Sequence, residues 1–259
     1  MPEWTSLEIS SWVGRHLWPL FRIASFLMVV PIFGTQIVPV RVRLGIALLL
    51  TMVVVPNLGP TPAIDALTWP SVEVILYQVL IGTGMGFMVM VLFQLFVVAG
   101  QIIAMQMGLG FASMMDPTNG VSVAVLSQFY LMLVTLLFLA MNGHLVMIEV
   151  LVESFRTIPI GYQAFAPEAL AQLFSMLTWM FVGALMIALP AVTALLVVNL
   201  AFGVMTRAAP QMNIFSLGFP FTLVFGLFIV WVSFSGFLPQ FQQLTEEMFA
   251  LLKGVIGSP

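Results

Sequence analysis

This sequence predicts an all-α fold embedded in a membrane. The chain of 259 residues contains only 7 basic and 10 acidic residues, whereas about 25% of the residues in soluble domains are charged. Hydrophobic residues make up 61% of the chain, and the mean hydropathy is +1.15. So few charged side chains are unable to cover the surface of a water-soluble fold. The chain is therefore predicted to be a polytopic membrane protein or a subunit buried in a larger apolar assembly.

Composition also excludes several classes of function. The net charge of -3 offers no basic surface for a phosphate backbone, so no nucleic-acid partner is expected. Cysteine is absent, which excludes disulfides, cysteine-ligated zinc, iron–sulfur clusters and thiol nucleophiles. His16 and His144 are the only histidines, too few for a histidine-rich metal site. No catalytic residue, metal site or cofactor is predicted, and we expect a protein that is not an enzyme.

Long uncharged runs predict the membrane helices. No charged residue lies between Glu73 and Asp116 or between Glu168 and Arg207. One helix needs about 20 apolar residues to cross the hydrocarbon layer. The simplest count is six spans, near residues 12–32, 44–58, 74–98, 121–148, 170–200 and 215–238.

Several of these runs exceed the length of one span but are too short for two spans and a turn. Pro190 lies inside the fifth run, Pro220 inside the sixth, and six glycines interrupt the third. We therefore expect kinked helices and helical hairpins in place of six plain rods. The tail at 244–256 has apolar residues at amphipathic helix spacing and is predicted to lie on a surface or face a partner.

Charged residues near the apolar runs have competing interpretations. Glu149, Glu153 and Arg156 share one helix face by their spacing. A charged helix end leaving the membrane is the favoured interpretation, and a carboxylate site for a metal or proton and a partner contact are the alternatives. Arg15 and Arg22, with His16, lie in or beside the first run. They are expected to snorkel or to pair with a neighbouring subunit, with an ion path as the alternative.

Glycines at 82–86 also allow two interpretations. The letters GTGMG are superficially similar to a nucleotide-binding loop, but no Lys-Ser/Thr pair follows and no strand pattern precedes. Small residues spaced by four let helix backbones approach closely in a membrane. Close helix packing through Gly82 and Gly86 is therefore the favoured interpretation.

The most informative stretch is MGLGFASMMDPTNG at 107–120, which lies between two apolar runs. Its glycines and its Asp-Pro and Asn-Gly pairs are typical of turns. Asp116 is placed to cap the following helix, with Pro117 at the first helical position. An ordinary interhelical loop is one interpretation. The other is a buried loop that lines or closes a path, which apolar Phe111 and the flexible side chain of Met114 favour.

Five motifs in the same order resemble those of the FliR family, membrane proteins of the flagellar type III export gate. Injectisome counterparts have a similar plan. The motifs are Arg22 in the first apolar helix, PIFGTQIVPVRVR at 31–43, GQIIAMQMGLGFASMMDP at 100–117, LAMNGHLVMIEVLVESFRTIP at 139–159 and ALPAVTALLVVNLAFGVMTRAAPQMNIFSLGFP at 188–220.

The resemblance implies a subunit that forms, with FliP and FliQ, a channel for the export of unfolded flagellar proteins. It implies a FliP-like helical part at 1–190 and a FliQ-like helical hairpin with an amphipathic tail at 191–259. Further expected partners are FlhA and FlhB of the export apparatus. The expected location is the bacterial inner membrane, within the flagellar basal body.

The resemblance also implies a plug loop at 107–117 that closes the resting channel. Its matching positions are Met107, Gly108, Gly110, Phe111, Ala112, Met114, Met115, Asp116 and Pro117. Helix packing and subunit contacts are expected at Gly82, Gly86, Arg207, Pro210, Asn213, Gly218 and Pro220.

Two other classes of function remain as alternatives. A secondary transporter of a small solute needs paired ionisable groups at mid-membrane, which the charge-poor runs disfavour. A membrane-embedded enzyme is disfavoured because no constellation of histidine, cysteine and carboxylate residues is present.

Overall fold

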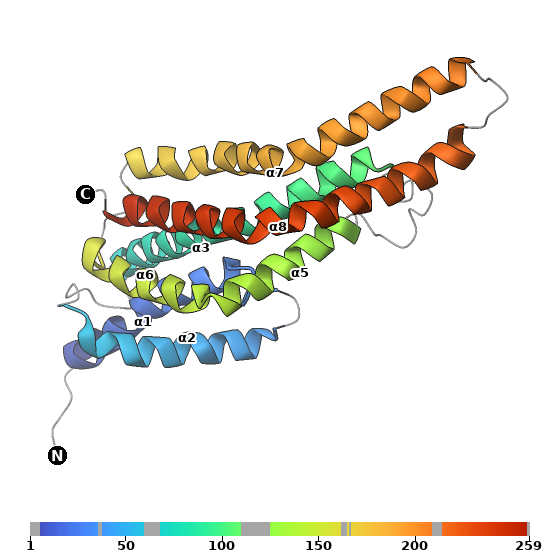
Figure 1. Cartoon of the computed structure of the whole chain (residues 1–259). Coiled ribbons are helices and arrows are strands. Elements are labelled where there is room, and N and C mark those ends of the chain that lie inside the picture. The colour runs from blue at the N-terminus through green and yellow to red at the C-terminus, as the bar shows by residue number, and fades with distance from the viewer. Residues whose placement is uncertain are drawn as a thin grey trace. The chain divides into compact units, whose positions relative to one another are not determined.

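The computed structural model describes residues 6–35, 38–59, 68–109, 125–161, 165, 167–208 and 214–257. Within these ranges the protein is all-α, as predicted, with seven α-helices, one short 3-10 helix and no strand. The elements, labelled in Figure 1, are α1 (Ser6–Val29), α2 (Val40–Val54), η1 (Val55–Asn57), α3 (Trp69–Gln106), α5 (Val125–Ala140), α6 (Gly143–Thr157), α7 (Pro167–Ala208) and α8 (Ile214–Gly257).

The helices belong to two compact units that interleave along the chain. Unit 1 comprises Met1–Val91, Phe138–Met176 and Glu247–Pro259, and unit 2 comprises Leu92–Leu137 and Leu177–Glu246. Helices α3, α5, α7 and α8 each contribute residues to both units. These units are defined by contacts within the chain, whereas the predicted division at residue 190 is based on likeness to FliP and FliQ. That division stays a prediction.

Unit 1 is built on α1, which packs against α2 and η1. The buried face of α1 carries Trp18, Ile23, Phe26 and Leu27 at helical spacing. Helix α1 forms where the first membrane span is predicted, but it is not among the described helices that are apolar enough to cross a membrane. Its basic side chains lower the hydropathy below that of a spanning helix.

Unit 2 has an aromatic core. The Phe96 ring lies 5.4 Å from the Phe237 ring and 5.7 Å from the Phe241 ring, centroid to centroid. Tyr130 of α5 adds a further contact with Phe237 at 5.5 Å. These tilted arrangements are the ones that the charge distribution of aromatic rings favours. The cluster therefore joins α3, α5 and α8 inside unit 2.

Fewer membrane spans are found than the six predicted. Four described helices are long and apolar enough to cross a membrane. The number rises to five if the bent pair α5–α6 is counted as one span. The four are Val40–Asn57, Trp69–Gln106, Pro167–Ala208 and Gly218–Gly257. In α3, 61% of the most apolar stretch is buried inside the protein, against 22–28% in the other three. Helix α3 is thus the most buried of the four, while the other three expose more of their apolar side chains.

The predicted span at 121–148 contains a sharp break, in line with the expected kinked helices. Helices α5 and α6 are bent by 70° at this point. Asn142 takes a left-handed backbone conformation with φ 58°, which asparagine tolerates better than most residues. A Cβ atom on Gly143 would lie 2.7 Å from the Phe138 ring, so a side chain there would displace that ring. The Asn-Gly pair at 142–143 thereby permits the bend.

The internal prolines do not end their helices. Pro190 lies inside α7, and Pro220 and Pro239 lie inside α8. Proline has no amide hydrogen to donate to the Met186 carbonyl oxygen, so one helical hydrogen bond is missing at Pro190, yet α7 continues past it. These prolines suggested that α7 and α8 would be broken, but neither helix ends at a proline.

The predicted tail helix at 244–256 is the last part of α8 and not a separate element. Its apolar residues Leu244, Met248, Leu252 and Val255 are buried within the chain. The expectation of a surface-lying or partner-facing helix is therefore wrong for this face. The amphipathic spacing was read correctly, but such spacing does not identify what covers the apolar side.

Candidate functional site

The predicted plug loop begins at a well-formed helix end. Helix α3 ends at Gln106, and Gly108 has a left-handed φ of +84°. The Gly108 amide donates to the Met105 carbonyl oxygen at 3.1 Å, and the Leu109 amide donates to that of Ala104 at 3.0 Å. These two bonds with a left-handed glycine form a Schellman motif. The motif sets the direction in which the chain leaves α3.

Within unit 2, α8 packs against Met107 and Gly108 at the end of α3. The Thr222 hydroxyl donates to the Met107 carbonyl oxygen at 3.4 Å, and the Met107 side chain is fully buried. A Cβ atom on Gly226 would lie 2.5 Å from Met107 Cγ, and one on Gly108 would lie 3.1 Å from the Phe219 ring. Glycine at 226 therefore leaves the space that Met107 fills.

The chain returns into the same unit at the start of α5. A Cβ atom on Gly100 of α3 would lie 2.8 Å from Ser127 Cα, so the two backbones are in close contact. The Ser127 hydroxyl donates to Gln101 Oε1 at 3.2 Å. Both ends of the segment that contains the plug loop are thus attached to α3 or α8 by contacts inside unit 2.

Only the first two predicted plug residues, Met107 and Gly108, fall in the described ranges. The remaining seven lie outside them: Gly110, Phe111, Ala112, Met114, Met115, Asp116 and Pro117. The plug role itself stays a prediction, and so does the placement of Asp116 and Pro117 as the start of a helix.

Gly82 and Gly86 face α1 inside unit 1. A Cβ atom on Gly82 would collide with the Ser25 hydroxyl and the Arg22 carbonyl oxygen. One on Gly86 would lie 2.9 Å from Val29 Cβ. The close approach of α1 and α3 therefore requires glycine at 82. A role for either glycine in subunit contacts stays a prediction.

Substitution at Gly82 provides a direct test of this contact. Gly82→Ala is expected to lower the free energy of unfolding by about 1–3 kcal/mol, because the Ser25 hydroxyl could rotate away but the Arg22 carbonyl oxygen is backbone and could not. The measurement is the unfolding midpoint of the purified protein in mild detergent. Gly45→Ala in α2 is the matched control, since nothing lies within 4 Å of its added methyl group. It should be neutral or slightly stabilising. Equal midpoints for the two variants would contradict the contact.

The predicted C-terminal positions are divided between described and undescribed parts. Arg207 is exposed in the last turn of α7, Gly218 is buried in α8 and Pro220 is exposed. Pro210 and Asn213 lie outside the described residues. The Phe202 ring of α7 meets the Phe221 ring of α8 edge-on at 5.2 Å. These helices are therefore the arms of a hairpin near residues 209–213, and likeness to FliQ stays a prediction.

The strongest polar feature of unit 1 is Arg22, which is fully buried. Its Nε donates to Gln78 Oε1 at 2.9 Å. Its Nη1 donates to the Ser154 carbonyl oxygen at 2.9 Å, and its Nη2 donates to that of Ile158 at 2.9 Å. One guanidinium thus joins α1, α3 and the end of α6. The expectation that Arg22 snorkels or pairs with a neighbouring subunit is wrong, because its partners are all in this chain.

Two further details characterise the Arg22 site. The guanidinium carbon lies 4.3 Å from the centroid of the Phe155 ring, a cation–π contact. Among the described residues no carboxylate pairs with Arg22, so neutral acceptors alone stabilise its charge. Gln78 Nε2 is buried without a hydrogen-bond partner in the same part of the structure. The sequence identified Arg22 as unusual, but partners 56 to 136 positions away carry no local signal.

The acidic pair on α6 has a simpler setting. Glu149, Glu153 and Arg156 are all exposed on that helix. No cluster of three or more metal-ligating side chains occurs in the described part of the chain. Their exposure agrees with the charged helix face that the spacing favoured.

Comparison with known proteins places this architecture in a family. Residues 13–248 match the family of bacterial export proteins, family 1. The flagellar biosynthetic protein FliR of Escherichia coli K12 is 37% identical, covering 99% of this chain and 98% of the relative. FliR of Pectobacterium carotovorum is 35% identical with the same coverage, and FliR of Aquifex aeolicus is 33% identical over 82% of each chain. These similarities extend through both units and all seven described α-helices. The chain therefore belongs to the FliR family of flagellar export proteins.

Proposed function

We propose that this chain is a non-enzymatic subunit of the flagellar type III export gate in the bacterial inner membrane, within the basal body. It forms the channel with FliP and FliQ, and unfolded flagellar proteins pass through that channel. FlhA and FlhB are the further partners in the export apparatus. The part at 1–190 is FliP-like, and 191–259 is a FliQ-like hairpin with its tail.

The observation that carries the proposal is the attached base of the plug loop. Met107 is buried against Gly226, and Gly108 caps α3. On the other side of the segment, Ser127 contacts Gly100. The points at which the chain leaves α3 and enters α5 are therefore fixed within unit 2. In the proposed mechanism the loop between them closes the channel to ions at rest and moves aside when substrate enters.

The outward faces of the long helices support an assembled state. On α7, the side chains of Leu196, Leu200 and Val204 are 58–68% exposed. On α8, the side chain of Val224 is 66% exposed. These four residues lie in the part at 191–259 that is predicted to be a FliQ-like hairpin. Contiguous apolar surface of this kind marks contact with lipid or with other subunits. We assign the α7 and α8 faces to FliP and FliQ subunits.

Co-purification tests the proposed assembly. The chain is expressed with FliP and FliQ of the same organism, extracted in mild detergent through a tag on this chain, and analysed by size and mass spectrometry. We expect FliP and FliQ in the same peak at fixed ratios. A membrane protein of another function with the same tag serves as the control. Elution of the chain alone, as a monomer or homo-oligomer, would contradict the gate and favour a solute transporter.

A further inference from the structure

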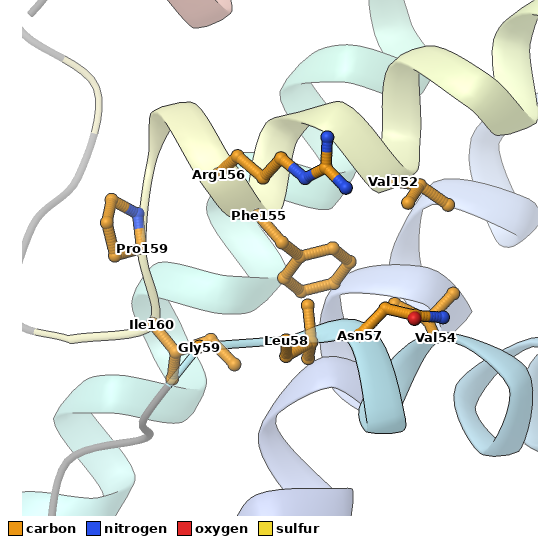
Figure 2. A pocket seen from close by; sticks show the side chains of 9 residues that line it. All are labelled: Val54, Asn57, Leu58, Gly59, Val152, Phe155, Arg156, Pro159 and Ile160. Carbon is orange, nitrogen blue, oxygen red and sulfur yellow. The ribbon is translucent and has the colours of Figure 1, made fainter.

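A cavity of about 450 Å³ lies in unit 1, between the end of α2 and the end of α6. Its lining residues are Val54, Asn57, Leu58, Gly59, Val152, Phe155, Arg156, Pro159 and Ile160. Figure 2 shows Phe155 and Arg156 projecting from α6, with Asn57 and Leu58 on the opposite wall. The cavity is within the size range of small-molecule sites, which is about 300–1,000 Å³.

The cavity combines apolar walls with positive charge. Val54, Leu58 and Val152 supply aliphatic surface, and Phe155 supplies an aromatic ring. The exposed Arg156 makes no ion pair or hydrogen bond within the described residues, and Glu153 on the same helix does not pair with it. The ring of Phe155 also contacts the guanidinium of the buried Arg22. The described residues that line the cavity include Arg156 and no carboxylate, so the charge that they provide is suited to an anion.

The surface beside the cavity is apolar and belongs to a candidate membrane span. Leu49, Met52 and Val53 of α2 are 64–69% exposed, within a turn or two of Val54. The stretch Val40–Asn57 is one of the helices able to cross a membrane, and the cavity lies at its C-terminal end. Ends of spanning helices are located where the hydrocarbon layer meets the polar headgroups.

We propose that this cavity binds an anionic glycerophospholipid. The phosphate lies against the guanidinium of Arg156 and the amide of Asn57, and the acyl chains run along Leu49, Met52 and Val53. A guanidinium binds phosphate through two parallel hydrogen bonds, which a neutral surface does not offer. Basic pockets between membrane helices are known to bind acidic lipid headgroups. Continuity with the exposed face of α2 favours a lipid over an acidic peptide as the occupant.

Lipid retention on the purified protein, with or without co-purifying subunits, tests this site. The protein is exchanged into nanodiscs of phosphatidylglycerol or of phosphatidylcholine, released, and weighed intact by mass spectrometry. Wild-type protein is expected to retain phosphatidylglycerol in preference to phosphatidylcholine. Arg156→Gln is expected to reduce phosphatidylglycerol retention about fivefold, as expected for one basic residue near an anionic lipid. Arg156→Lys should retain an intermediate amount, because it keeps the charge but loses the paired hydrogen bonds.

Arg41→Gln is the matched control, because Arg41 is also exposed but lies at the opposite end of α2. It should retain phosphatidylglycerol as the wild type does. Equal retention of the two lipids by the wild type would overturn the proposal, and so would undiminished retention by Arg156→Gln. Equal losses in the Arg156 and Arg41 variants would indicate general surface charge and overturn it as well. Since the measurement needs no export, its outcome is separate from that of the gate function.

Discussion

Cells that carry a deletion of Gly108 to Met115 are expected to leak ions across the inner membrane while still assembling the gate. The reason is that the deletion removes most of the proposed plug loop, while all the residues of the helices remain and only the cap of α3 is lost. Membrane potential and intracellular pH, measured with dyes in cells expressing the variant, report the leak. Secretion of flagellar subunits into the medium reports export. A variant that assembles, exports normally and leaks no ions would show that the plug assignment is wrong.

A second deletion separates the plug from the helix cap. Removal of Gly110 to Met115 keeps Gly108 and the Schellman bonds that end α3. If the leak comes from an open channel, both deletions leak alike. The point variant Gly108→Ala addresses the cap alone: a side chain at φ +84° costs about 1–2 kcal/mol. It is expected to weaken the end of α3, measured as faster amide hydrogen exchange there, with a smaller leak than either deletion.

Replacement of Arg22 by alanine is expected to lower the free energy of unfolding more than Gly82→Ala or Gly108→Ala. It leaves three buried acceptors, Gln78 Oε1 and the carbonyl oxygens of Ser154 and Ile158, without their donor. It also removes a large buried side chain and so opens a cavity. Each buried acceptor left without a donor costs about 1–3 kcal/mol and the cavity adds to this, so a loss of about 3–5 kcal/mol is expected. The unfolding midpoint of the purified protein, followed by tryptophan fluorescence, measures the effect.

Two further variants separate charge from geometry at this site. Arg22→Lys keeps a positive charge, but its single ammonium group is unable to reach acceptors on α3 and α6 together. Its loss should be smaller, about 1–3 kcal/mol. Arg15→Ala is the matched control: Arg15 lies two turns earlier on α1 and is exposed, so the expected change is within about 0.5 kcal/mol. An unfolding midpoint for Arg22→Ala equal to that of the wild type would show that the network contributes no stability.

The fold class was predictable because it depends on composition. Seventeen charged residues among 259 exclude a soluble surface, and uncharged runs longer than one span indicate helices in a membrane or an assembly. The number of spans was not predictable in the same way. Basic residues lower the hydropathy of α1, and a left-handed Asn142 divides the run at 121–148. Local backbone geometry of that kind does not change the hydropathy from which spans are counted.

Proline and glycine were less informative than expected about helix ends. Helix α3 continues through Gly82, Gly86 and Gly100, and α7 continues through Pro190. At the glycines close packing against neighbouring segments accompanies the continued helix, and at Pro190 the loss of one hydrogen bond does not end α7. Propensity is a weak prior that tertiary context overrides. By contrast, Gly108 ends its helix because its left-handed backbone is stabilised by two hydrogen bonds.

Polar partners distant in sequence could not be predicted at all. Arg22 was recognisable as an ionisable group in an apolar helix, but its acceptors lie on α3 and at the end of α6. Nothing in the spacing of Gln78, Ser154 and Ile158 relates them to Arg22. The cavity beside Arg156 has the same origin, because the chain segments that line it are about 100 positions apart. The tertiary fold, and not a local motif, creates both features.

Attachment at both ends gives the proposed plug a kinetic property. A closing element that diffused freely would reseal the channel at a rate set by its concentration in the cell. A segment held at Met107 and at Ser127 stays beside its target after each substrate has passed. Tethering of this kind raises the effective concentration of the closing element at its target above that of a free one. Resealing is then a first-order event within one subunit, and its rate is independent of how many gates the membrane contains.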